Sequence, residues 1–110
     1  MSKRLPEITH LQFLILDALA GGDQAGRELR ERMTAHGVRN SAPAFYQMMG
    51  RLEDARLVEG RYDQKVLAGQ TVKERRYQIT RTGSRALAAT RSFYRDRLAA
   101  ARIVRKLSHA

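Results

Sequence analysis

Residues 40–60, NSAPAFYQMMGRLEDARLVEG, constrain the fold most, because a strongly marked helix start is followed by a change of hydrophobic period. Ser41 can cap a helix with its side-chain oxygen, and Pro43 suits the first turn, where its missing N–H leaves no hydrogen bond unmade. Apolar residues then recur at helical spacing, but from Leu57 onward they occupy every second position. This pattern predicts a helix over about 42–55 that leads directly into a half-buried strand.

The alternating segment predicts one arm of a β-hairpin. The loop LAGQ interrupts the alternation, and a second strand over 71–79 can return antiparallel beside the first. The register that we expect pairs Val66 with Thr71. It also sets Gly60 opposite Tyr77, where a glycine would leave room for the ring.

Three further helices flank this unit. Thr9 is a plausible N-cap for the amphipathic run HLQFLILDALAGG, and a second, mostly polar helix follows over about 24–36. Thr80 or Thr82 can cap a long last helix over about 83–107. At ~1.5 Å per residue, such a helix is about 37 Å long. That is too long to lie wholly on so small a body, so we expect it to pack against a partner.

Length and charge limit the classes of protein. A chain of 110 residues forms one domain. Its net charge of +10 favours a polyanionic partner, either nucleic acid or an anionic membrane. No apolar stretch reaches the ~18 residues that a spanning helix needs, and MSKRLPEITH lacks the apolar region of a signal peptide. We therefore expect a cytoplasmic protein without a membrane partner.

The sequence offers no motif for catalysis, a metal or a cofactor. It contains no cysteine, which excludes disulfides and thiolate zinc sites. His10, His36 and His109 lack the spacing of metal ligands, and no nucleophile or phosphate-loop motif occurs. We therefore expect neither an enzyme nor a cofactor-binding protein.

The expected elements follow the order of a winged helix-turn-helix: helix, helix, capped helix, hairpin and long helix. The expected fold class is α+β and mostly helical, with a two-stranded wing and a long C-terminal dimerisation helix. Residues 1–80 would form the DNA-binding region and residues 81–110 the dimerisation helix, within one compact domain. The third helix would enter the major groove and contact bases from its first turns.

Exposed residues of the third helix and the wing are the candidate DNA contacts. Gln47 can read adenine through its N6 and N7 edges, and cations of the wing would add sequence-independent attraction. The candidates are Asn40, Ser41, Ala44, Tyr46, Gln47, Arg51, Lys65, Lys73, Arg75 and Arg76. A half-buried ring for Tyr46, a solvated helix face for Gln47 and Arg51, and a solvated strand for KERR stay open as alternatives.

Apolar residues of the first and last helices are the candidate dimer interface. The first helix is apolar on more than one flank, so a single small core would leave some of its apolar surface in water. The candidates are Phe13, Leu16, Leu87, Phe93, Tyr94, Leu98, Ala101 and Val104. A solvated flank of this interface is the simplest interpretation of the eight Lys and Arg that follow residue 80.

Three segments resemble the PadR family of bacterial transcriptional regulators. ITHLQFLILDALAGG is similar to the opening helix of that family, SAPAFYQMMGRLEDARLVEG to its recognition helix, and KERRYQITRTGSRAL to its exit into the last helix. The resemblance covers roughly residues 8–90, and the short length resembles the subfamily with a single C-terminal helix. It implies a winged-helix dimer that represses transcription and is released by a small ligand.

The sequence departs from the family at two places. Arg56 stands where members usually have glycine, and a residue with a side chain in the left-handed conformation there would cost roughly 1–2 kcal/mol unless the helix ends differently. Some drug-sensing relatives hold flat ligands between tryptophans of the last helix, and this sequence has no tryptophan. The resemblance therefore implies no particular effector.

Our leading hypothesis is a dimeric repressor in the bacterial nucleoid that binds double-stranded DNA at an inverted repeat, with half-sites ~34–36 Å apart. Two other classes stay open. One is a winged-helix module that binds another regulator instead of DNA, and a monomer that ignores duplex DNA would favour it. The other is a non-specific chromosome or RNA binder, which would show no preferred site.

Overall fold

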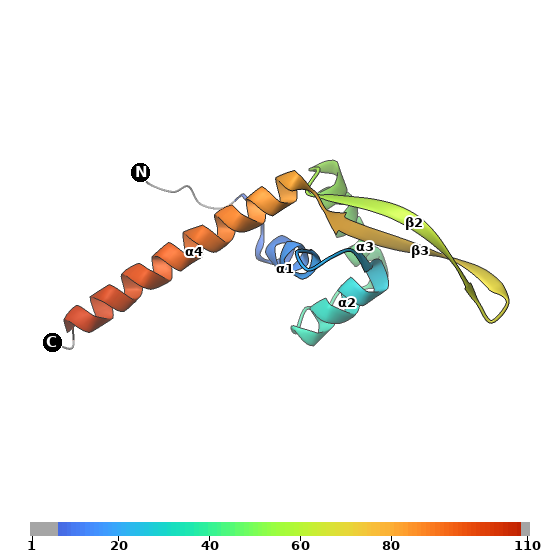
Figure 1. Cartoon of the computed structure of the whole chain (residues 1–110). Helices are drawn as coiled ribbons and strands as arrows, with labels where there is room; N and C mark the ends of the chain where they lie inside the picture. The colour runs from blue at the N-terminus through green and yellow to red at the C-terminus, as the bar shows by residue number, and fades with distance from the viewer. Residues whose placement is uncertain (1–6, 109–110) are drawn as a thin grey trace.

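The computed structural model describes residues 7–108, except for the side chains of residues 104 and 106–108. Within this part the elements are α1 (His10–Leu19), β1 (Gln24–Ala25), α2 (Gly26–Ala35), α3 (Ala42–Asp54), β2 (Val58–Leu67), β3 (Gln70–Ile79) and α4 (Arg81–Ser108). The mostly helical α+β winged helix-turn-helix is confirmed, with β2 and β3 as its wing (Figure 1). No helix among the described residues is both long and apolar enough to cross a membrane.

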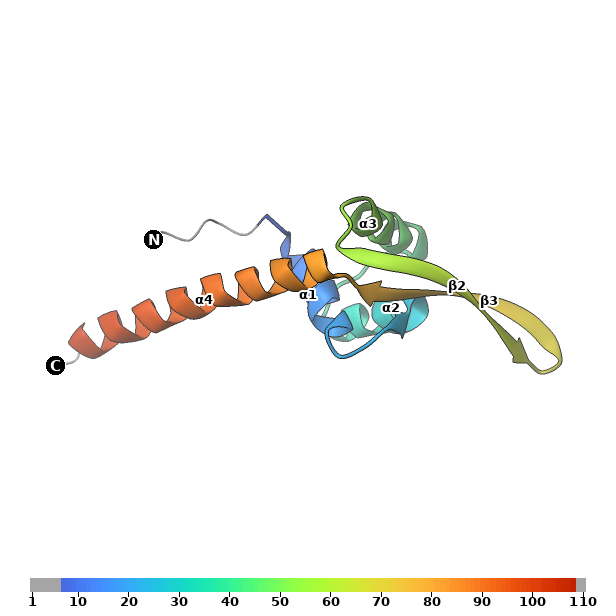
Figure 2. The same cartoon turned by 45° about the horizontal axis from the view of Figure 1, so that its top comes forward.

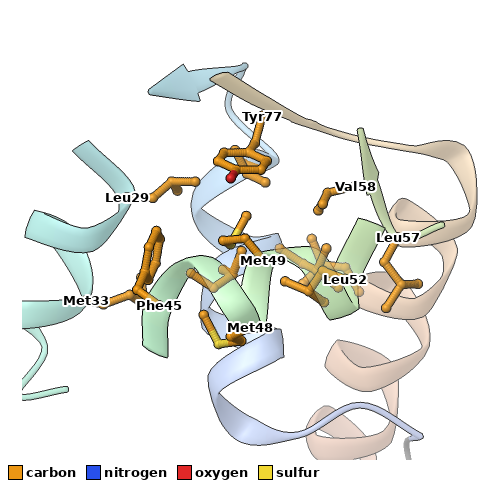
Figure 3. Close-up of a cluster of buried hydrophobic side chains, with 13 residues drawn as sticks. Leu29, Met33, Phe45, Met48, Met49, Leu52, Leu57, Val58 and Tyr77 are labelled. Atoms are coloured by element: carbon orange, nitrogen blue, oxygen red, sulfur yellow. The ribbon is translucent and has the colours of Figure 1, made fainter. Parts of the chain in front are cut away.

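The core lies between α1, α2, α3 and the inner end of the wing. The amphipathic faces of the three helices supply most of it, because their apolar residues recur at helical spacing. Its buried members are Ile15, Leu16, Leu19, Leu29, Met33, Phe45, Met48, Met49, Leu52, Leu57, Val58, Tyr77 and Leu87. Figure 3 shows side chains of α2 and α3 gathered near Val58 and Tyr77 of the wing. The two predicted helix caps, Thr9 for α1 and Ser41 for α3, are confirmed.

The sheet is antiparallel, with the strand order β1-β3-β2. The predicted register of the hairpin is confirmed, since Val66 pairs with Thr71. The strands run further than expected, because a turn of Ala68 and Gly69 replaces the predicted four-residue loop. These two residues have φ values of 52° and 78°, and the tight turns that best join twisted strands require such positive angles.

The structure corrects the predicted start of the second helix. Gln24 and Ala25 are not helical but form β1, which pairs with β3. The side-chain amide of Gln24 donates to the carbonyl oxygen of Ala18 at 2.6 Å and anchors this extended backbone. A strand of two residues has no periodicity, so the sequence pattern merged it with α2.

Only the inner end of the wing is buried. Val58 and Tyr77 are each 2% exposed, whereas Tyr62 is 69% and Val66 73% exposed. The prediction of a half-buried strand is therefore wrong for the outer half, which extends beyond the helices (Figure 2). This outer half depends on its own backbone ladder and on side-chain contacts closer to the body.

The first turns of α4 pack on the body, and the helix then leaves it. α4 begins at Arg81, two residues before the predicted start, and Thr80 Oγ1 accepts a hydrogen bond from the Gly83 N–H at 2.9 Å. Leu87 and Thr90 are buried, but every described side chain from residue 97 onward is exposed. Figures 1 and 2 show α4 and the wing extending to opposite sides of the helices, along a long axis of 68 Å.

One backbone corner, residues 55–57, joins α3, β2 and α4. Arg56 has a φ of 61°, and the N–H groups of residues 56 and 57 bond back to carbonyls of α3 at 2.9 and 3.0 Å. The Arg56 carbonyl accepts a hydrogen bond from Thr80 Oγ1 at 2.6 Å. Gly83 lies so close to the corner that a Cβ there would be 2.1 Å from the Leu57 carbonyl oxygen. α3 therefore ends in a left-handed residue that is not glycine.

Replacing Arg56 with glycine should stabilise the protein. Glycine adopts a positive φ without the steric cost of roughly 1–2 kcal/mol that a side chain adds, although its freedom in the unfolded chain offsets part of the gain. We expect Arg56→Gly to raise the free energy of unfolding in urea by about 1 kcal/mol. Arg56→Ala removes the same charge but keeps the strained conformation. Equal stabilisation by both variants would contradict this account of the corner.

Candidate nucleic-acid interface

The exposed face of α3 lies opposite its buried stripe. Ser41 Oγ accepts a hydrogen bond from the Ala44 N–H at 3.2 Å and so satisfies one of the free donors of the first turn. Ala44, Gln47 and Arg51 are exposed, and their spacing places them on one face. A helix that presents a small and an amide side chain in its first two turns and a cationic side chain in its last turn suits contact with base edges and phosphates.

Tyr46 is packed on one side and open on the other. Its side chain is 39% exposed, and its ring meets Phe45 edge-on, with 5.3 Å between the ring centroids. The ring fits because Gly26 has no side chain, since a Cβ on Gly26 would lie 2.8 Å from the Tyr46 ring. The ring is thus held against α2 while part of it faces solvent.

Two arginines of α2 join this surface, and the sequence analysis missed them. Arg30 donates from Nε and Nη2 to the carbonyl oxygen of the half-buried Asn40, at 3.3 and 3.2 Å, and so secures the loop before α3. Arg27 and Arg30 line a hollow of about 510 Å³ that also borders Ala42 and Tyr46. On a helix as charged as α2, no periodicity distinguishes these arginines from solvated ones.

The predicted cations of the wing lie on two different faces. Successive residues of a strand point to opposite sides of the sheet. Lys73 and Arg75 lie on the side toward α3, where both border the hollow between α3 and the wing. Lys65 and Arg76 lie on the far side. Only the first pair therefore shares a face with α3.

The far face of the wing is charge-compensated. Asp23 lies 2.6 Å from Arg61 and 3.4 Å from Arg76. Glu74 lies 3.0 Å from Lys65. The hydrogen bond from Arg61, with a second from Arg76, holds the pKa of Asp23 below its usual range, so this carboxylate stays ionised. Lys65 and Arg76 are thus already paired with carboxylates of their own chain.

A second hollow, of about 660 Å³, lies between α3 and the wing. It is lined by Tyr46, Gly50, Glu53, Asp54, Tyr62, Lys73, Arg75 and Tyr77. Nη2 of Arg75 donates to both carboxylate oxygens of Glu53, at 2.8 and 2.7 Å. The Arg75 guanidinium also lies 4.7 Å from the ring centroid of Tyr62 and 5.5 Å from that of Tyr77. Lys73 is exposed and has no ion pair among the described residues.

Gly60 makes room for this ion pair, a role that the sequence analysis did not predict. The predicted pairing of Gly60 with Tyr77 is confirmed. A Cβ on Gly60 would lie 2.6 Å from Nη2 of Arg75 and 2.8 Å from Oε1 of Glu53. Burial raises the pKa of the Tyr77 hydroxyl, and its hydrogen bond with Arg75 opposes this only in part.

The dimer candidates differ in burial. Leu16 and Leu87 lie in the core of their own chain, 0% and 3% exposed. They present no surface to a second subunit, so their prediction is corrected. The candidates that keep exposed surface are Phe13 and Phe93, which are half-buried, and Tyr94, Leu98 and Ala101, which are exposed. The side chain of Val104 lies outside the described residues.

Most of the net charge of the chain lies on its last helix. Residues 81–110 carry eight Lys and Arg against one acidic residue, whereas residues 1–80 carry thirteen against ten. Arg81, Arg85 and Arg95 are exposed. The winged-helix region itself is therefore close to electrical balance.

Known proteins share this sequence pattern and this fold. The model of the transcriptional regulator PadR-like family matches residues 15–89 of the chain. No curated protein matches the sequence. The family match runs from the second half of α1 to the first part of α4, and so it includes α3, the wing and both hollows.

Several solved structures have the same architecture. A PadR family transcription regulator from Clostridium difficile R20291 is 18% identical, with 92% of this chain and 96% of that chain covered and a TM-score of 0.67. A PadR-like transcriptional regulator from Bacillus cereus is 24% identical, with 91% and 92% covered and a TM-score of 0.63. Bacillus subtilis PadR in complex with operator DNA is 18% identical, with 73% and 45% covered and a TM-score of 0.61.

Proposed function

The chain belongs to the PadR-like family of transcriptional regulators, and on this premise we propose that it is a dimeric repressor that binds operator DNA. The proposal rests on the capped, exposed start of α3, which lies beside a wing face that carries Lys73, a cation without an ion pair in the described part of the chain. The similar protein PadR of Bacillus subtilis has been solved in complex with operator DNA. In this proposal the protein acts in the cytoplasm, on the DNA of the bacterial nucleoid, and it is not an enzyme.

In this proposal α3 enters the major groove with its first two turns. Gln47 reads the N6 and N7 edge of an adenine, because an amide can donate and accept there at once. Phosphate contacts come from Asn40, Ser41, Tyr46, Arg51 and Lys73, joined by Arg30 of α2. The direct contacts leave out Arg27, Lys65, Arg75 and Arg76, because carboxylates of the same chain already pair with them.

A second copy of the chain covers the exposed apolar residues of α4. Tyr94, Leu98 and Ile103 are 43%, 63% and 60% exposed, and burial of such surface is the main drive for association. Two-fold symmetry then presents two α3 helices to an inverted repeat with half-sites ~34–36 Å apart. A small effector that binds the pair would release the operator.

Binding to the DNA upstream of the chain's own gene tests the proposal. If each dimer contacts six to ten phosphates, the affinity should fall about 10³–10⁵-fold between 50 and 200 mM salt. A random duplex of equal length should bind far more weakly at the higher salt concentration. Equal affinity for both duplexes would instead indicate a non-specific binder, and no binding to either at low salt would indicate a protein-interaction module.

Two substitutions separate base reading from phosphate contact. Gln47→Ala should relax the preference at one base position of each half-site, at a cost of about 1–3 kcal/mol for the preferred base. Lys73→Ala should weaken all sequences alike and reduce the salt slope by about one. Binding titrations with the operator and its single-base variants measure both effects. Unchanged selectivity in Gln47→Ala would exclude Gln47 as the base reader.

A charge placed among the exposed apolar residues of α4 should separate the subunits. Leu98→Glu buries a carboxylate in the proposed interface, so light scattering after size-exclusion chromatography should show a monomer. Ala100→Glu is the control, because it introduces the same side chain at an exposed position on the other side of the helix and should leave the dimer intact. A Leu98→Glu protein with the mass of the wild-type dimer would place the interface elsewhere.

A further inference from the structure

The ion pair between Glu53 and Arg75 ties the last turn of α3 to the middle of β3. Among the described residues, it is the only side-chain ion pair or hydrogen bond between α3 and the wing. Arg75 and Glu53 are shielded from solvent, with 24% and 27% of their side-chain surface exposed. Loss of one partner therefore leaves the other partly desolvated and unpaired, unlike loss of an ordinary surface salt bridge.

Three neighbours restrict this ion pair to one geometry. The rings of Tyr62 and Tyr77 lie near the guanidinium of Arg75, within the range of cation–π attraction. The missing side chain of Gly60 provides the space in which the pair sits. A planar guanidinium that is stacked and hydrogen-bonded at once has little freedom to reorient.

Contacts on both faces of the wing control its direction. On the far face, ion pairs join it to Asp23 and to Arg27 of α2. On the face toward α3, the ion pair of Glu53 and Arg75 is the only one among the described residues.

In the described part of β2 and β3, only Val58 and Tyr77 are buried, and both lie toward the inner end of the hairpin. A two-stranded ribbon that is open on both sides has little stability of its own and twists readily. A restraint at Arg75 therefore influences where every residue further out, including Lys73 and the turn, is placed.

We infer that Glu53 and Arg75 are positioning residues that set the direction of the wing relative to α3. The effect on DNA binding rests on the proposed function. By fixing the wing, the ion pair sets the distance between the base contacts of α3 and the phosphate contact of Lys73. Arg75 then acts through Glu53 and does not itself contact DNA. This differs from the role of Arg75 that the charge of the wing predicted from the sequence.

The positioning role and plain electrostatics have opposite consequences when Glu53 loses its charge. Glu53 lies on the side of α3 that faces the wing, so removing a negative charge there would strengthen the attraction of a polyanion. Under the positioning role, the same change releases the wing and weakens specific binding. Asp54 is the matched control, because it is the next residue, lines the same hollow and has no ion pair among the described residues.

We expect Glu53→Gln to weaken binding to the operator about tenfold, within the range typical of coupled neighbours. Asp54→Asn should bind the operator as tightly as the wild type or more tightly. Arg75→Gln should weaken binding without changing the salt slope, whereas loss of a phosphate contact would reduce that slope by about one. The inference would be overturned if Glu53→Gln bound the operator with the same affinity as Asp54→Asn. It would also be overturned if Arg75→Gln had a smaller salt slope than the wild type.

A double-mutant cycle tests whether the two residues act as one unit. The variant with both Glu53→Gln and Arg75→Gln should lose no more affinity than either single variant, because the contact is already lost after the first change. Thermal unfolding curves identify a temperature at which every variant is folded. Affinities compared at that temperature contain no contribution from global unfolding. Additive losses would show independent roles and overturn the inference.

A distance measurement tests the positioning without DNA. The chain has no cysteine, so Arg32→Cys in α2 and Thr71→Cys near the turn can carry two spin labels specifically. The distance distribution should be narrow with Glu53 present, stay narrow in Asp54→Asn and broaden in Glu53→Gln. An unchanged distribution in Glu53→Gln would overturn the inference. Absence of DNA binding in the wild type would overturn the proposed function while leaving this test valid.

Discussion

The backbone corner at residues 55–57 is the constraint on which the other parts depend. The carbonyl of Arg56 accepts from Thr80, and the carbonyl of Leu57 accepts from the Thr80 N–H at 3.1 Å, so the start of α4 is hydrogen-bonded to the end of α3. Gly83 completes the junction because it brings the α4 backbone against the Leu57 carbonyl. The end of the helix proposed to read bases and the start of the helix proposed to pair subunits thus meet at one corner, which contains the left-handed Arg56.

Much of the fold could be predicted from the sequence where local chemistry decides the structure. Thr9 and Ser41 begin their helices as predicted, and the period-two pattern sets the hairpin register, because a slip would exchange the faces of every side chain. β1 could not be predicted, since two residues have no period. The ion pairs could not be predicted either, because Asp23 and Arg61 meet across 38 positions of sequence, and only tertiary structure brings them together.

The candidate site shows the same division between local and distant information. The exposed face of α3 follows from helical spacing alone, and Ala44, Gln47 and Arg51 all lie on it. Which cations of the wing are free depends on the carboxylates around them. Glu74 of the wing itself pairs with Lys65, whereas Glu53 and Asp23, from outside the wing, pair with Arg75 and Arg76. A count of basic residues therefore overstates what the wing offers to phosphates, and it omits Arg30, which approaches α3 from another helix.

The aromatic lining of the hollow between α3 and the wing has a further consequence. The chain has four tyrosines and no tryptophan, and three of the tyrosines, Tyr46, Tyr62 and Tyr77, border this hollow. Intrinsic ultraviolet emission of the protein therefore arises largely from the place where α3 and the wing face each other. Tyrosine fluorescence can therefore report on this hollow without an attached dye. A molecule that binds in the hollow, or a change in the stacking of the rings on Arg75, should change the emission intensity.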